Sequence, residues 1–202
     1  MKEIPVAEKT IWGISLIVAP AIMAISSFFW DNGRYDATGG TLVVLDSLFL
    51  IPAFMGLFSL VKEKYPRYAA WGQLIAILGC IAGANFGFAD FFTHAFNISH
   101  QTYLDTLAKY PVASNLLLFQ TGPLVPLSLL VLGVVLLRTR SVDIWVATLI
   151  CAGAIMFPLS RIGRNQMLAH ASDVLWLVPF AYIGINMLNG KSAVYSGNTV
   201  KI

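Results

Sequence analysis

The stretch Gly79–His94 has the sequence GCIAGANFGFADFFTH, in which small and polar residues recur at helical spacing. Intervals of four, four, three and four residues separate Gly79, Gly83, Gly87, Asp90 and His94. Residues with this spacing share one stripe of one helix. Glycines four residues apart allow a neighbouring helix to approach closely within a membrane. We therefore expect a helix contact at the glycine end of the stripe and the wall of a polar cavity at its Asp90–His94 end.

The composition of the chain is that of a membrane protein. Hydrophobic residues make up 57% and charged residues 11% of the 202 residues, and the mean hydropathy is +0.75. Soluble domains typically carry about 25% charged residues, so the composition indicates a multi-span membrane protein. The net charge of +3 is small and the basic residues flank apolar stretches, which argues against nucleic acid as a partner. Cys80 and Cys151 lie inside different apolar stretches, and we expect no disulfide between them.

Six apolar stretches approach or exceed the ~20 residues that a helix needs to cross the hydrocarbon core of a bilayer. They cover residues 11–30, 40–61, 69–92, 113–137, 142–161 and 171–189. Of the thirteen Lys and Arg residues, four fall on one side of these spans and nine on the other; the four are Arg34, Lys109, Arg161 and Arg164. The positive-inside rule then places both termini in the cytoplasm. The sequence thus predicts an all-α, six-helix membrane bundle that forms a single domain over residues 1–202 and lies multi-pass in the cell membrane.

The longest loop, residues 95–112, is predicted to contain a short helix on the outer side. Ser99 is suited to cap its first turn, and Tyr103, Leu104, Leu107 and Ala108 would form its apolar face. Such a helix would lie in the membrane interface over the mouth of the bundle. It would serve either as a lid or as a plain connector, and the sequence leaves both readings open.

Strong polar groups on five different helices are predicted to lie at one depth. Counting from the cytoplasmic end of each stretch at about 1.5 Å per residue gives depths of ~24–27 Å. The five are Asp46, Asn85, Gln120, Arg161 and Asp173. Because charged groups facing lipid are costly, we expect these groups to turn inward, to pair or to line water. Asp46 has no partner in its own stretch, so we expect a buried pair with Arg161, and Arg164 as the partner of Asp173.

The first functional hypothesis is a binding site for a small polar or amphipathic ligand, with transport or conversion of that ligand as its extensions. Arginine side chains suit a carboxylate or phosphate, and intramembrane ionisable groups commonly mark pathways and sites. The candidate ligand-binding residues are Asp46, Asn85, Asp90, Gln120, Arg161, Arg164 and Asp173. The partners expected on this hypothesis are the lipid bilayer and a small-molecule or lipid-like ligand.

Two other hypotheses remain open at this point. A metal-dependent hydrolase would use His94 and His170, with nearby carboxylates, to hold a divalent ion such as zinc, although HExxH and GxSxG motifs are absent. Haem ligation by the same histidines is disfavoured because residue counting places them at different heights. Alternatively, the polar layer only locks the bundle, in a structural or accessory subunit. The sequence does not decide among these hypotheses or set the oligomeric state.

Overall fold

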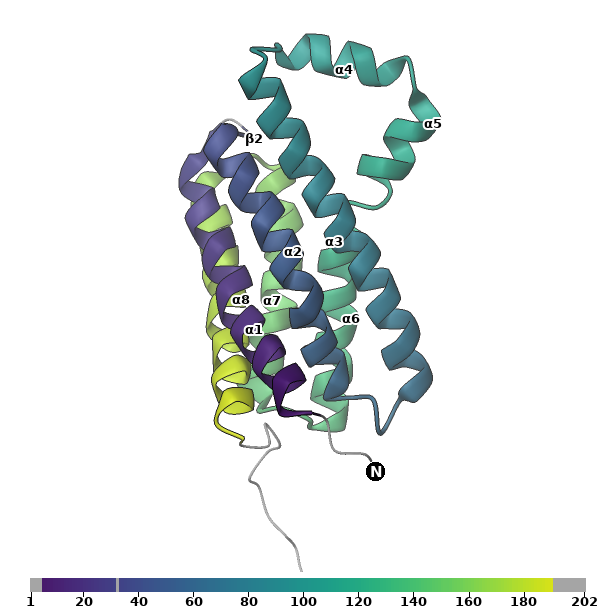
Figure 1. The fold of residues 1–202 in the computed structure, drawn as a ribbon, viewed down its shortest axis with the longest axis vertical. Helices are drawn as coiled ribbons and strands as arrows, with labels where there is room; N and C mark the ends of the chain where they lie inside the picture. The colour runs from purple at the N-terminus through teal and green to yellow at the C-terminus, as the bar shows by residue number, and fades with distance from the viewer. Residues whose placement is uncertain (1–4, 32, 191–202) are drawn as a thin grey trace, which may run out of the picture.

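Six helices long and apolar enough to cross a membrane are present in the computed structural model, which describes residues 5–31 and 33–190 (Figure 1). Five of the spans are centred on α1 (Val6–Ser26), α2 (Ala37–Ser59), α3 (Pro66–Ala95), α7 (Ile144–Ile162) and α8 (Gln166–Leu188). The fourth span runs over Pro111–Thr139 and ends in α6 (Leu124–Thr139). A 3₁₀ turn, η1 (Ser27–Phe29), extends α1, so that the first span runs from Val6 to Phe29. The predicted all-α bundle of six membrane-length helices is confirmed in these terms.

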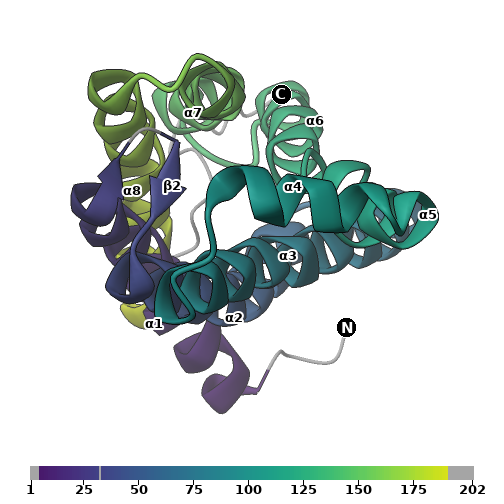
Figure 2. The same cartoon turned by 90° about the horizontal axis from the view of Figure 1, so that it is seen from above.

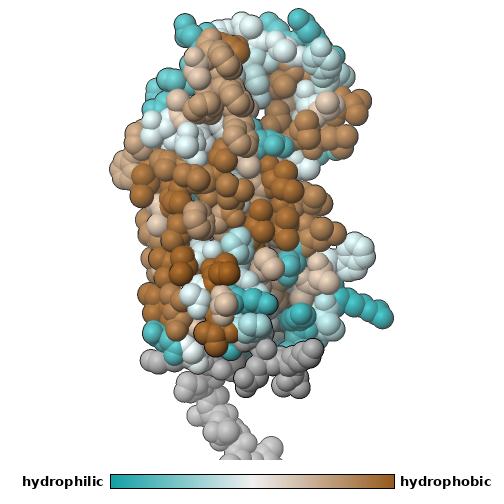
Figure 3. All heavy atoms as spheres, in the orientation of Figure 1, coloured by the Kyte–Doolittle hydropathy of each residue, from teal (hydrophilic) through white to brown (hydrophobic). Residues whose placement is uncertain are grey.

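The helices form a closed ring in which α1 contacts α2, α2 contacts α3, α3 contacts α6, α6 contacts α7, α7 contacts α8 and α8 contacts α1 (Figure 2). Apolar side chains fill the ring at the end near the N-terminus; Phe54, Phe58, Leu132, Ile150 and Phe180 are almost completely buried there. Apolar residues also dominate the middle of the outer surface, with hydrophilic residues towards both ends (Figure 3). An apolar belt of this kind is what a protein surrounded by lipid presents.

The glycine stripe of α3 is a helix contact, as its spacing predicts. A Cβ atom added to Gly87 would lie 2.7 Å from the carbonyl oxygen of Gly40 and 2.9 Å from the amide nitrogen of Val44, both on α2. A Cβ atom on Gly83 would lie 2.7 Å from the Ser47 hydroxyl oxygen, and one on Gly79 would meet the backbone of α6. Glycine is therefore what lets α2 and α3 approach to backbone contact.

The fourth span is broken, whereas the hydropathy pattern predicts one continuous helix over 113–137. It consists of α5 (Pro111–Ser114), a π-helical segment η2 (Asn115–Phe119), a turn at 120–123 and then α6. Gly122 and Pro123 explain the turn, because proline lacks an amide hydrogen and disfavours a helical conformation in the residue before it. Because the residues on both sides of the turn are apolar, the hydropathy pattern does not reveal the turn.

The end of the bundle opposite the N-terminus, here called the hairpin end, carries a β-hairpin and a short helix. Strands β1 (Trp30–Asp31) and β2 (Arg34–Tyr35) pair antiparallel, with Trp30 opposite Tyr35. The short helix α4 (His100–Ala108) runs from the end of α3 to α5, on one side of the bundle (Figure 1). The Ser99 side chain accepts a hydrogen bond of 3.1 Å from the Thr102 amide, which confirms the predicted cap.

Candidate functional site

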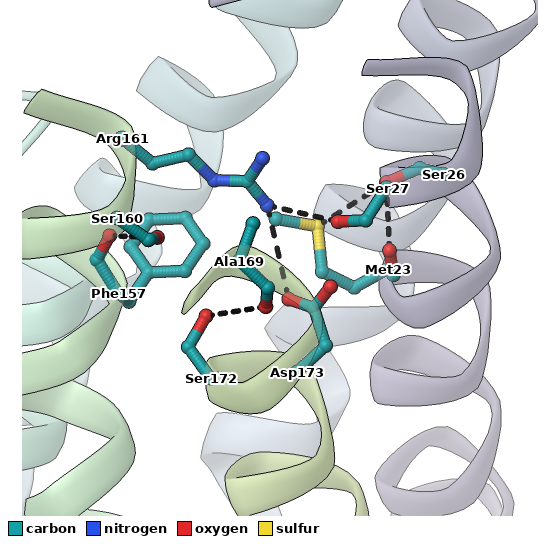
Figure 4. A network of polar contacts seen from close by, with 9 residues as sticks. All are labelled: Met23, Ser26, Ser27, Phe157, Ser160, Arg161, Ala169, Ser172 and Asp173. Atoms are coloured by element: carbon teal, nitrogen blue, oxygen red, sulfur yellow. Dashed lines mark hydrogen bonds and ion pairs between the residues drawn. The ribbon is translucent and has the colours of Figure 1, made fainter. Parts of the chain in front are cut away.

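Arg161, on the last turn of α7, extends its side chain into the ring at the hairpin end (Figure 4). Its Nη2 atom donates a hydrogen bond of 3.1 Å to the Ser27 hydroxyl and lies 3.7 Å from Asp173 Oδ1 on α8. The Asp173 side chain is 1% exposed and that of Arg161 is 17% exposed. One buried guanidinium therefore joins α7, η1 and α8.

Three aromatic rings surround this guanidinium. Its central carbon lies 4.6 Å from the ring centroid of Trp30, 5.0 Å from that of Phe157 and 5.5 Å from that of Tyr35. Rings at these distances attract a cation through their electron-rich faces, and more strongly where water is excluded. The hairpin thus contributes two of the three rings that hold the Arg161 side chain inside the bundle.

Several buried polar atoms around Arg161 have no hydrogen-bond partner among the described residues. They are Arg161 Nε and Nη1, both carboxylate oxygens of Asp173 and the Tyr35 hydroxyl. Trp176 Nε1 also has no partner there, but the Trp176 indole lies against Gly153 of α7, away from this group. An unsatisfied buried donor or acceptor costs about 1–3 kcal/mol, and more when it is charged. Such groups are rare in folded proteins, and each calls for an explanation, such as strain, a bound water, an ion or a catalytic role. We call Ser27, Tyr35, Asp46, Arg161 and Asp173 the polar cluster.

Asp46 is the second carboxylate of the polar cluster. It is buried on α2, within electrostatic range of Asp173 and Arg161. The expected Asp46–Arg161 ion pair is wrong for this structure, in which the partner of Arg161 is Asp173. The reason is the order of the helices in the ring: α7 and α8 are neighbours joined by a short turn, whereas α2 is next to neither.

Arg164 is likewise not the partner of Asp173. It lies in the α7–α8 turn with a φ angle of 49°, and its side chain is exposed at the hairpin. A Cβ atom added to Gly33 would meet the Arg164 side chain at 3.1 Å, so the two residues are in contact. Depth counting therefore did not identify which of the two arginines turns inward.

Asp90 fastens the hairpin to α3 instead of forming a unit with His94. The Tyr35 amide donates a hydrogen bond of 3.3 Å to Asp90 Oδ2, and Arg34 Nε lies 3.9 Å from Asp90 Oδ1. Arg34 also donates a hydrogen bond of 2.5 Å to the Thr93 hydroxyl. These contacts hold the hairpin over the end of α3.

An open groove of about 670 Å³ lies between the hairpin and the end of α3. The residues that line it are Phe28, Phe29, Asp31, Arg34, Tyr35, Asp36, Thr93, His94, Asn97 and Ile98. Tyr35 is common to both regions: it lines the groove, and its ring contacts the Arg161 guanidinium. Burial raises the pKa of Tyr35 above its ordinary value, which the positive charge of Arg161 only partly offsets. The Tyr35 side chain is therefore uncharged and lies between the groove and the Arg161 guanidinium.

Asn85 and Gln120 have no hydrogen bond or ion pair with the described members of the polar cluster. The Asn85 side chain donates a hydrogen bond of 3.1 Å to the Leu117 carbonyl and so ties α3 to η2. Gln120 is exposed in the turn at 120–123. Its expected depth was counted along an unbroken fourth helix, and the turn interrupts that helix.

The two candidate metal-binding histidines lie at the hairpin end but in different surroundings. His94 lines the groove, and the His170 ring packs against Phe28 at a centroid distance of 4.6 Å, with the two ring planes tilted by 45°. Across the part of the chain that the structure describes, no group of three or more His, Cys, Asp or Glu side chains is placed to hold a metal ion. The ligand set that the zinc hypothesis requires is therefore not assembled there.

Sequence reasoning missed the hairpin and with it Ser27 and Tyr35 as members of the polar cluster. A signal for the hairpin was present, because Asn32-Gly33 separates two aromatic-containing dipeptides, and Asn-Gly favours a two-residue hairpin turn. Gly33 adopts a φ angle of 86°, as this type of turn requires. No local signal indicates that Trp30 and Tyr35 reach Arg161, which lies more than a hundred residues away in the chain.

Comparisons with known proteins do not assign the chain to a family. A scan against protein-family models, a search of curated proteins and a search of solved structures each found no match.

Proposed function

We propose that this protein is a multi-pass protein of the cell membrane that binds a small polar or amphipathic ligand at the polar cluster. In this proposal both termini are cytoplasmic and the hairpin end faces outward. The groove beside Tyr35 is then the route from outside, and the ligand supplies the hydrogen-bond partners that the protein does not. Transport or conversion of the bound molecule would build on this binding step.

One observation carries the proposal: buried polar atoms of Tyr35, Arg161 and Asp173 lie together without hydrogen-bond partners among the described residues. A cluster that served only to lock the helices would gain most by satisfying its own donors and acceptors, as buried ion pairs that stabilise proteins do. Here Arg161 makes one hydrogen bond, to Ser27, and a 3.7 Å contact with Asp173. The remaining hydrogen-bonding capacity of the cluster is suited to a ligand.

The sidedness is tested by labelling single cysteines with a membrane-impermeant thiol reagent. Thr38 is exposed at the hairpin end, and Glu63 is exposed in the loop between α2 and α3 at the opposite end. With Cys80 and Cys151 changed to Ala, Thr38→Cys should be labelled in intact cells and Glu63→Cys only in inside-out vesicles. The opposite pattern would reverse the topology and remove the outward-facing site.

Access to the polar cluster is tested with the same cysteine-free background and the small neutral reagent methyl methanethiosulfonate. Ser27 and Ala147 are both completely buried, but Ala147 belongs to the apolar core, fourteen residues before Arg161 on α7. We expect Ser27→Cys to react at least about 100-fold faster than Ala147→Cys, because reaction in the core requires larger opening of the fold. Equal, slow rates at both positions would mean that the cluster is a closed lock, and would overturn the proposal.

A further inference from the structure

The ionisable side chains of the polar cluster do not balance in charge. Two carboxyl groups lie near one guanidinium, that of Arg161: Asp173 is in contact with it, and Asp46 is within electrostatic range of it. Among the described residues Asp46 forms no hydrogen bond and no ion pair, and Asp173 has the Arg161 guanidinium and the Ser27 hydroxyl beside it but no other hydrogen-bonding partner. The imidazole of His170 is also within electrostatic range of Asp173, and it lies outside this count. With both carboxyls ionised, Asp46, Asp173 and Arg161 sum to one negative charge.

We infer that the polar cluster selects a cationic ligand, with an ammonium group held between Asp46 and Asp173. This inference rests on the proposed ligand-binding function and specifies its substrate class. An ammonium carries three hydrogen-bond donors and one positive charge, so it supplies donors to both carboxylates and neutralises the excess. A carboxylate or phosphate ligand would instead place a further negative charge beside two buried carboxylates.

The remaining unpartnered donors define the rest of the ligand. Arg161 Nε and Arg161 Nη1 both require an acceptor. A hydroxyl or carbonyl oxygen on the same molecule meets this need without adding charge. The rings of Trp30 and Tyr35 stand on the hairpin side of Arg161 and offer apolar contact to the body of such a molecule. The site is therefore suited to an amphipathic amine that also carries a neutral oxygen acceptor.

The inference is tested by comparing two charged reagents at Ser27→Cys, in the background without Cys80 and Cys151, at pH 8. The probes are 2-aminoethyl methanethiosulfonate, an ammonium, and 2-sulfonatoethyl methanethiosulfonate, an anion of similar size. Their rate ratio at Ser27→Cys is divided by the ratio at the exposed Thr38→Cys, which removes their intrinsic difference in reactivity. We expect a normalised preference for the ammonium of at least about tenfold, because a buried negative charge acts through a poorly screening medium.

Second-site variants show whether Asp46 is the source of the preference. Asp46→Asn should reduce the normalised ratio several-fold, and Asp46→Glu, which keeps the charge, should largely preserve it. Asp105→Asn changes an exposed acid on α4 and should leave the ratio unaltered. Identical ratios in Asp46→Asn and its parent would overturn the assignment of Asp46.

The outcomes separate this inference from the proposed function. If the neutral reagent modifies Ser27→Cys rapidly but the normalised ratio is near one, Asp46 is neutralised by a proton, and the inference fails while ligand binding stands. A preference for the sulfonate would likewise overturn it and point to Arg161 as the selecting group. If the neutral reagent does not reach the thiol of Ser27→Cys, the proposed function fails and the inference fails with it.

Discussion

Gly87→Leu is expected to destabilise the bundle by more than about 3 kcal/mol, the range of severe overpacking. A Cβ atom at Gly87 would already lie 2.7 Å from the carbonyl oxygen of Gly40 and 2.8 Å from a side-chain carbon of Val44. The obstructing oxygen belongs to the backbone of α2, so it cannot move unless the whole helix moves. The two helices would separate and expose the core below the contact. Thermal unfolding in detergent, with the fraction of monodisperse protein, measures the effect.

Two comparisons make this prediction specific to the helix contact. Gly83→Leu should cost less than Gly87→Leu, since the nearest atom at Gly83 is the Ser47 hydroxyl oxygen, which can rotate away. Ala70→Leu lies on the exposed surface of the same helix and should have almost no effect. Equal midpoints for Gly87→Leu and Ala70→Leu would show that α2 and α3 do not pack through the glycine stripe.

Arg161→Gln is expected to have the second largest effect, about 3–5 kcal/mol of lost stability where burial is deep and less where water enters. The substitution removes the only guanidinium that the described residues place beside Asp46 and Asp173. It leaves two buried carboxylates without a positive partner. Denaturation of the purified protein in mixed micelles measures the loss, with Arg164→Gln as the control because Arg164 is exposed.

Double-mutant cycles identify the partner of Arg161. Combining Arg161→Gln with Asp173→Asn should cost at least about 1 kcal/mol less than the sum of the single changes, since neither charge is then stranded. The same cycle with Asp46→Asn should show a smaller coupling, because Asp46 makes no ion pair with Arg161 in the described part of the chain. A larger coupling energy between Arg161 and Asp46 than between Arg161 and Asp173 would contradict this result and support the Asp46–Arg161 pair that depth counting predicts.

The sequence predicts the helices and one contact because the physics behind them is local. Hydropathy over about 20 residues marks each span, and the cap at Ser99 depends on a neighbouring amide three residues away. The spacing of Gly79, Gly83 and Gly87 indicates a close approach on one face of α3, although it does not name α2 and α6 as the partners.

The composition of the polar cluster depends on the order of helices around the ring, which no local pattern encodes. Residue counting places Asp46, Arg161 and Asp173 at a common depth, and all three belong to the cluster. The choice of Asp46 as the ion-pair partner failed because depth alone does not say that α7 stands beside α8. Gln120 was misplaced for a different reason, since the turn before α6 interrupts the helix through which its depth was counted.

Whether the polar cluster is a ligand site or a lock is decided by the rate at which methyl methanethiosulfonate modifies Ser27→Cys. The matched reference is Ala147→Cys, at a position that is equally buried in the apolar core. For a ligand site we predict that Ser27→Cys reacts at least about 100-fold faster than Ala147→Cys, under conditions where both variants stay folded. Two equally slow rates would contradict a ligand site, and Arg161 and Asp173 would then be a structural pair.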